Sequence, residues 1–220
     1  MFIKVLTFFF PWTIRRAILN KLFGYNIHKE ARIGLAWVFP KELVMEKGSR
    51  IDHFTVAINL DRIVLNAKAS IGRGNWITGY STRGETLHFK HQVDRKAELI
   101  VGNSSSITKN HHIDCTNSII IGQFATIAGY NSQFLTHSIN LKEGRQDSAP
   151  IIIGNYTLVG TNVVILGGSV LPDYSVLGAK SLLNKKFIND WKVYGGVPAK
   201  ELKEIPKDNK YFLREDGFVY

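Results

Sequence analysis

Histidine is the residue type in this chain best suited to acid–base chemistry, and the seven histidines are unevenly placed. His137 lies in the stretch Thr136-His137-Ser138, and no histidine follows it. A neutral imidazole accepts protons near neutral pH, so a loop histidine can act as a general base toward a weakly acidic group. His111 and His112 are adjacent, a poor arrangement for chelating one ion, and no metal site is expected.

The chain is basic, with 28 Lys and Arg residues against 18 Asp and Glu residues and a formal charge of +10. This balance favours a partner that carries phosphates or an anionic surface. Nothing resembles a recognition helix or a base-stacking platform, so nucleic acid is not expected as a partner. The single Cys115 excludes an internal disulfide and favours a reducing, cytoplasmic location.

A six-residue repeat indicates the element that positions these groups. A helix would repeat apolar residues every three or four positions, and a half-buried strand every two. A period of six is typical of a three-sided solenoid, whose sides are short strands and whose corners are tight turns. Aliphatic residues return at every sixth position at Ile153, Val159, Ile165, Leu171, Leu177 and Leu183. The residue four places after each of the first five is small or β-branched: Thr157, Val163, Ser169, Ser175 and Ser181.

The same register recurs earlier, so residues 27–185 are expected to form one continuous β-helix. It slips by two residues between Ile63 and Leu65 and between Ile119 and Ile121. Two stretches, 82–98 and 133–150, break the period altogether. A solenoid keeps its core intact when it loops outward at a corner, and such loops usually carry function. Chemistry is therefore expected in these loops, the second of which contains His137.

The two ends of the chain differ from the repeat. Residues 1–26 form an N-terminal segment, in which Trp12 to Phe23 is predicted to be a short amphipathic helix. Either this helix packs on its own domain or a neighbouring subunit, or it makes peripheral contact with the inner face of a membrane. Residues 186–220 form a cap and tail, and the cap is expected to be helical over Phe187–Trp191 and Pro198–Lys203.

Three stretches and a tail signature resemble the hexapeptide-repeat acyltransferases, especially the bacterial O-acetyltransferases of polysaccharide and capsule synthesis. They are Ile121 to Gly129, Thr136-His137-Ser138, Ile151 to Asn155, and Tyr194-Gly195-Gly196-Val197-Pro198-Ala199-Lys200. The resemblance covers nearly the whole chain. It implies an all-β fold, a left-handed parallel β-helix, with a short N-terminal helix and a C-terminal helical cap.

The resemblance also implies a reaction, the transfer of an acetyl group from acetyl-CoA to a sugar hydroxyl. His137 matches the family's loop histidine, which removes the hydroxyl proton. A sugar hydroxyl is too weak an acid to attack a thioester unaided, so a general base is chemically reasonable. Thr161 matches the position whose backbone N–H stabilises the oxyanion.

Further positions match family contacts to the cofactor. Asn184 stands where many relatives have Thr, and Leu158 stands where Trp is usual. Lysine suits a polyanionic cofactor because it binds phosphate as a point charge. The family also implies a homotrimer with each active site between two subunits and CoA in the groove between neighbouring prisms. The matched cofactor positions are Thr161, Ala179, Asn184, Lys185, Lys200 and Lys203.

The sugar or glycan acceptor is expected near a polar cluster at Asn110, His111, His112 and Asp114. His111 occupies a position where the repeat prefers a small residue. Departures from a local sequence pattern often occur at functional sites. Asp114 could orient a histidine. The acceptor sugar and the role of residues 82–98 stay open.

Three other functions compete with O-acetyl transfer. A sugar N-acyltransferase uses the same fold. A γ-type carbonic anhydrase would need three histidines around zinc, and no histidine follows His137. A non-enzymatic β-helix scaffold gives no reason for a histidine loop together with a basic tail.

Overall fold

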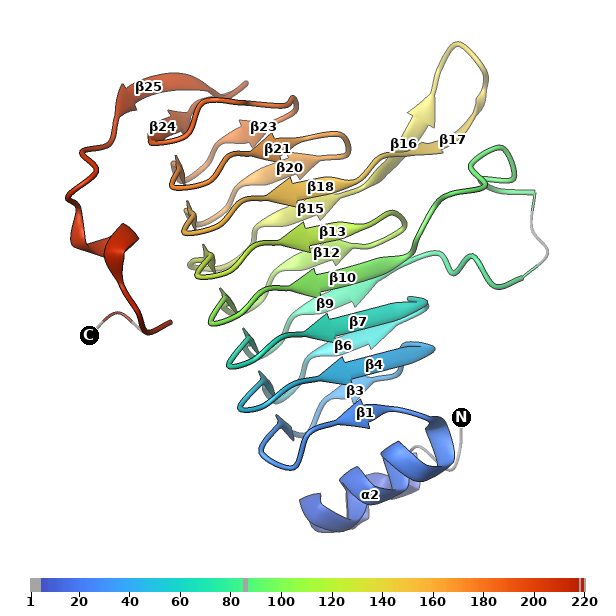
Figure 1. Cartoon of the computed structure of the whole chain (residues 1–220). Helices are drawn as coiled ribbons and strands as arrows, with labels where there is room; N and C mark the ends of the chain where they lie inside the picture. The colour runs from blue at the N-terminus through green and yellow to red at the C-terminus, as the bar shows by residue number, and fades with distance from the viewer. Residues whose placement is uncertain (1–4, 85–86, 218, 220) are drawn as a thin grey trace.

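The computed structural model describes residues 5–84, 87–217 and 219, and it is a three-sided prism of stacked parallel strands (Figure 1). The chain climbs as a left-handed coil from the N-terminal helix to the C-terminal hairpin. The strands are short because each side of a coil has room for only one or two inward residues before a turn. The predicted all-β solenoid is confirmed.

Each of the three faces is one sheet. Face A consists of β1 (Asn26–Ile27), β4 (Glu42–Met45), β7 (Arg62–Leu65), β10 (Glu98–Val101), β13 (Ile119–Ile121), β18 (Ile151–Ile153) and β21 (Val170–Leu171). Face B begins with β2 (Arg32–Ile33), β5 (Arg50–Ile51), β8 (Ser70–Ile71), β11 (Ser106–Ile107), β14 (Thr126–Ile127), β19 (Leu158–Val159) and β22 (Val176–Leu177). Face C consists of β3 (Trp37–Val38), β6 (Val56–Ile58), β9 (Trp76–Thr78), β12 (His112–Asp114), β15 (Gln133–Leu135), β20 (Val164–Leu166) and β23 (Leu182–Leu183).

The core is the stack of sixth-position aliphatic side chains along the prism axis. All of them from Ile153 to Leu183 are buried, and the small residues four places later are buried too. In-register parallel pairing, such as Ile127 with Val159 and Val159 with Leu177, places each aliphatic residue on its counterpart in the next coil. The predicted role of the repeat is thereby confirmed.

The two-residue slips lie on face A. In β7 both Ile63 and Leu65 are buried, and in β13 both Ile119 and Ile121 are buried. Because side chains alternate along a strand, a two-residue extension adds one more inward side chain and leaves the facing unchanged. The slips therefore widen one face without breaking the stack.

The predicted N-terminal helix is α2 (Trp12–Phe23), which follows a short 3₁₀ turn, η1 (Thr7–Phe9), and ends at Gly24 in the left-handed conformation. It lies across the open end of the first coil (Figure 1). Trp12 Nε1 donates to Ala31 O at 2.9 Å, and Arg15 Nη1 donates to Gly34 O at 2.9 Å. Polar side chains of α2 thus saturate backbone carbonyls that have no coil beneath them.

The Asn20 side chain completes this closure by exchanging two hydrogen bonds with the backbone of Ile27. One joins Asn20 Nδ2 to Ile27 O and the other joins Ile27 N to Asn20 Oδ1, each at 3.1 Å. Arg16 Nη1 also donates to Ile27 O, at 3.2 Å. An amide with one donor and one acceptor arm imitates the strand that would otherwise lie below β1.

The prediction of a helical C-terminal cap is wrong. The cap is an antiparallel hairpin of β24 (Lys192–Gly195) and β25 (Lys200–Glu204), and β24 continues face B in parallel with β22. The tail then runs through a short 3₁₀ turn, η2 (Lys210–Leu213). Further strand satisfies the N–H and C=O groups of the last coil directly, which a helix could not do.

Two neighbouring residues of β18 test the facing of the repeat. Ile153 is 1% exposed and Ile152 is 39% exposed. We expect Ile153→Ala to lower the free energy of unfolding by about 2–5 kcal/mol and Ile152→Ala by less than about 1 kcal/mol. Urea denaturation of both variants measures this difference. Equal losses would contradict the assigned facing.

Candidate active site

The candidate active site lies at the corner where the chain passes from face C to face A. Three successive coils contribute there: residues 82–98 follow β9, Asp114 ends β12, and His137 follows β15. His137 begins a two-stranded hairpin of β16 (His137–Asn140) and β17 (Arg145–Ser148), which projects from the prism (Figure 1). The predicted second loop is therefore shorter than 133–150, since β15 still belongs to face C.

His137 and Asp114 form a direct pair across two coils. His137 Nδ1 lies 2.8 Å from Asp114 Oδ2, and the backbone N–H of His137 also donates to Asp114 Oδ2, at 3.2 Å. The side chain of His137 is 43% exposed, whereas that of Asp114 is 13% exposed. The imidazole thus reaches solvent while its carboxylate partner is held behind it.

The Asp114 carboxylate is fixed by donors from two neighbouring threonines. Thr136 donates its backbone N–H and its hydroxyl to Oδ2, at 3.0 and 2.9 Å, and the Thr116 hydroxyl donates to Oδ1 at 2.6 Å. Burial alone would raise the pKa of Asp114, but the hydrogen bonds from Thr116, His137 and Thr136 outweigh it and lower the pKa below its ordinary value. Asp114 is therefore a carboxylate at neutral pH.

This pair determines which nitrogen of the histidine can accept a proton. A carboxylate only accepts hydrogen bonds, so the proton of neutral His137 must be on Nδ1. Nε2 then carries the lone pair. A histidine oriented in this way by a carboxylate is the arrangement required of a general base.

The 82–98 loop forms a wall beside His137. The Phe89 ring meets the His137 ring edge to face, with centroids 6.2 Å apart. Arg95, in the same loop, has a buried side chain whose guanidinium lies 4.6 Å from the Phe89 ring centroid. Its Nη1 donates to Thr116 O at 2.6 Å. The interrupted repeat predicts this loop but neither residue, because a loop without a repeat gives no register to read.

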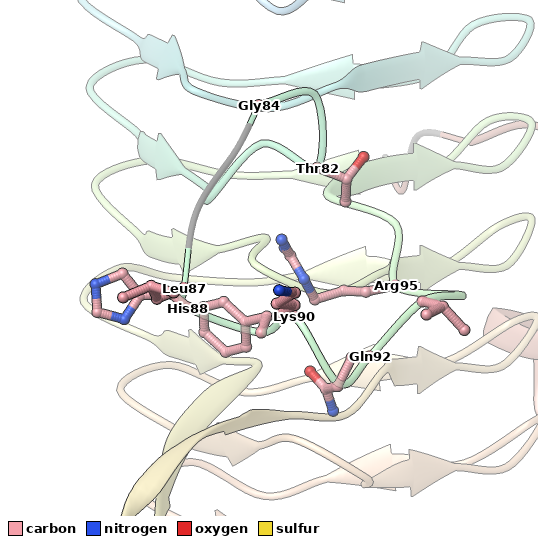
Figure 2. Close-up of a pocket in the computed structure, with 9 residues that line it drawn as sticks. Thr82, Gly84, Leu87, His88, Lys90, Gln92 and Arg95 are labelled. Atoms are coloured by element: carbon pink, nitrogen blue, oxygen red, sulfur yellow. The ribbon is translucent and has the colours of Figure 1, made fainter.

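Described residues of the loop line an open pocket of about 760 Å³ (Figure 2). Lys90 and Arg95 contribute positive charge to it, and Leu87 and Val93 contribute apolar surface. Thr82 anchors the start of the loop by donating its backbone N–H and hydroxyl to Asp61 Oδ2, at 2.8 and 2.7 Å. A cavity of this size and mixed lining suits a small polar molecule.

The loop and the hairpin are fastened to each other. Gln92 Nε2 donates to Asp147 Oδ1 and to Ser148 O, both at 2.8 Å, and the Ser148 hydroxyl donates to Gln92 Oε1 at 2.6 Å. His91 Nε2 lies 3.2 Å from Asp147 Oδ1. Because Ser148 pairs with His137 across the hairpin, these bonds tie the pocket wall to the base of the histidine strand.

The predicted acceptor cluster does not lie in one place. His111 is fully buried, where its ring nitrogens meet the Thr108 hydroxyl and the Ser132 N–H, and burial lowers its pKa to about 4. The prediction that His111 contacts an acceptor is therefore corrected, because its neutral ring is a packed corner residue. Asn110 is exposed at the corner between faces B and C, and His112 is exposed at the start of β12. Asp114 alone is at the His137 corner.

The predicted cofactor residues are also distributed. Thr161 and Ala179 lie one coil apart at the corner between faces B and C, where Lys180 N donates to Thr161 O at 3.0 Å. Asn184 and Lys185 are exposed just after β23. Lys200 and Lys203 are exposed on β25. Strand β20 separates the Thr161 corner from the corner that His137 occupies, so one chain does not bring these residues together.

Within residues 5–84, 87–217 and 219, no group of three or more His, Cys, Asp or Glu side chains is arranged to hold a metal ion.

Replacing Asp114 with Asn tests the assigned carboxylate. Its pKa in the folded state is below the ordinary value of 3.8, so its stabilising effect is present above that value and is lost as the pH falls through the lower folded value. We expect wild type to exceed Asp114→Asn in free energy of unfolding at neutral pH, and the gap to close below about pH 4. Urea titrations across this range measure the gap, with the exposed Asp94→Asn as control. A gap that persists unchanged in acid would contradict the assignment.

Comparisons with known proteins show similarity to acetyltransferases. The chain is 26% identical over 150 residues to the galactoside O-acetyltransferase of Escherichia coli (strain K12), covering 67% of this chain and 70% of that one. It is 24% identical over 168 residues to the chloramphenicol acetyltransferase of Morganella morganii, covering 70% and 76% of the two chains. No family model matches.

The fold is also that of a solved acetyltransferase structure. The polysialic acid O-acetyltransferase OatWY superposes with a TM-score of 0.62 at 19% identity, over 82% of this chain and 84% of that chain. At this identity the likeness concerns the fold alone. The prism, the sequence similarity to two acetyltransferases and the carboxylate-oriented histidine agree. The chain therefore resembles the hexapeptide-repeat acetyltransferases in its repeat, its fold and its sequence.

Proposed function

We propose that this protein transfers an acetyl group from acetyl-CoA to a hydroxyl of a sugar in a bacterial surface polysaccharide. The observation that carries the proposal is the His137–Asp114 pair, with Nδ1 and Oδ2 2.8 Å apart and the imidazole against Phe89, which also lines the pocket. A relative at 26% identity is named a galactoside O-acetyltransferase, which supports a sugar hydroxyl as the acceptor.

His137 acts as the base. Its Nε2 accepts the acceptor hydroxyl proton while that oxygen forms a bond to the acyl carbon, and Asp114 stabilises the resulting imidazolium. The protonated ring then gives its proton to the departing sulfur as the carbon–sulfur bond breaks. No covalent bond to the enzyme forms, and the histidine returns to its starting state.

Thr161 supplies the oxyanion donor through its backbone N–H, by its match to the family position. Thr161 and His137 occupy different corners of one prism, separated by β20. A second copy is therefore required to place one chain's Thr161 corner against another chain's His137 corner. This requirement supports a homotrimer with active sites between subunits.

The cofactor residues fit a polyanionic acyl donor. Lys185, Lys200 and Lys203 are exposed, and ammonium groups attract the phosphates of CoA as point charges. Asn184 adds an exposed amide, and Ala179 is an exposed small residue that lets a thin chain pass close to the corner. Acetyl-CoA supplies the activated acyl group, and these residues hold and orient it.

The acceptor occupies the pocket beneath the 82–98 loop. Lys90 and Arg95 present hydrogen-bond donors there, and Leu87 and Val93 offer apolar surface to the faces of a sugar ring. Asn110 and His112, exposed on face C and its edge, stay candidates for contacts made from a neighbouring subunit. The buried free thiol of Cys115 supports a reducing, cytoplasmic location.

His137→Ala removes the proposed base, and His28→Ala is a matched control far from the pocket. We expect turnover in His137→Ala to fall by about two to four orders of magnitude with the melting temperature unchanged. Release of CoA in the presence of a panel of free, nucleotide-linked and lipid-linked sugars measures turnover. Near-normal turnover in His137→Ala would rule out this base.

Lys185→Ala and Lys200→Ala test the cofactor groove. Removal of one ammonium–phosphate contact is expected to raise the KM for acetyl-CoA about tenfold and to change kcat much less. Lys41→Ala removes an exposed lysine from an N-terminal coil and serves as control. An unchanged KM in both groove variants would argue against the groove, although it would leave His137 untouched.

A further inference from the structure

The helix α2 presents both apolar and polar groups to the first coil: Leu19 is buried in the core, and Trp12 and Phe23 pack against it. Ordinarily the apolar stripe of a surface helix faces its own domain. Here Trp12, Arg15, Arg16 and Asn20 turn their polar atoms toward the carbonyls of the first coil. The helix nevertheless leaves further apolar side chains exposed, among them Ile14 and Leu22.

Exposed apolar side chains occur both on α2 and on the turn that precedes it. Phe9 is 83% exposed and Phe10 46%, and on α2 Ile14 is 48% and Leu22 66% exposed. Within α2, positions 14, 18 and 22 follow the four-residue spacing of one helix stripe. The outer face is defined by Phe9, Phe10, Ile14, Ala17, Ile18, Lys21 and Leu22.

The charge around the outer face is predominantly positive. No residue from 5 to 29 is acidic, and Lys21 lies within the stripe. Lys29, Glu30 and Arg32 are exposed close by on the first coil, and the Glu30 carboxylate lies 3.9 Å from Lys47 Nζ. Apolar side chains bordered by an excess of cations are complementary to a bilayer surface that contains anionic lipids.

The other possible occupants fit less well. A second copy docked end to end over the outer face would bring Lys21 of both chains into one desolvated contact. The helix has 12 residues, about 18 Å in length, which is too short to cross a bilayer. No helix in the described parts of the chain is long and apolar enough for that.

We propose that the outer face docks this protein on an anionic membrane surface. In this orientation α2 lies in the plane of the interface, the side chains of Phe10, Ile14 and Leu22 enter the acyl boundary, and Lys21 extends to the headgroups. The prism axis then points away from the membrane, because α2 covers one end of it (Figure 1). The inference does not depend on the acyl-transfer reaction.

Vesicle sedimentation of the full chain tests the proposal. The variant Ile14→Ser/Leu22→Ser removes two outer-face side chains, and Ile188→Ser is the control, since Ile188 is 87% exposed near the opposite end of the prism. With phosphatidylcholine vesicles that contain about 30 mol% phosphatidylglycerol, wild type and Ile188→Ser should bind alike. The double variant should show a partition coefficient at least about tenfold lower.

A charge variant keeps the test independent of any folding defect. Lys21→Glu leaves the apolar stripe intact, and it should lower the partition coefficient several-fold in low salt and much less in high salt. Equal binding by wild type, the double variant and Lys21→Glu would overturn the proposal, as would wild type that stays in the supernatant. The proposal would also be overturned if wild-type assemblies dimerised and the double variant did not. The outer face would then be covered by a second copy of the chain.

Discussion

The strands of this prism make their backbone hydrogen bonds to the coils above and below them. A segment that leaves the stack must therefore return at the corner where it left, or the next coil has nothing to pair with. Both excursions obey this constraint at one corner: residues 82–98 depart after β9, and the β16–β17 hairpin departs after β15. The active-site corner is a consequence of stacking.

Stacking also accounts for the good orientation of the pair at the centre of the site. Asp114 ends a strand whose neighbours are fixed on both sides, and Thr136 in the next coil is in register to donate to it. Two excursions from a common corner then reach each other, through Gln92 and Ser148. The histidine is thus supported by three coils, although its own strand is in a projecting hairpin.

The fold could be predicted from the sequence, because a six-residue period of aliphatic residues fits a three-sided solenoid. It fits neither a helix nor a half-buried strand. The aliphatic residues of this period are buried from Ile153 to Leu183. The sequence was also sufficient to single out His137 and the possible role of Asp114. It was insufficient wherever the outcome depended on contacts between distant segments. Three features depend on the corner of the prism at which each turn lies. They are the position of Asn110, the burial of His111 and the contact of Phe89 with His137. The strand pairing of the cap was missed because residues 187–203 lack the repeat.

The polar closure by Trp12, Arg15 and Asn20 at one end and the hairpin of β24 and β25 at the other have a consequence for the length of the molecule. A stack of identical rungs has no intrinsic stopping point, and an open rung would recruit another chain and propagate into a fibre. Each terminus presents chemistry that only a terminal rung can use. Whole coils can therefore be gained or lost by duplication or deletion in the middle of the sequence, while the polar closure and the hairpin remain at the two ends.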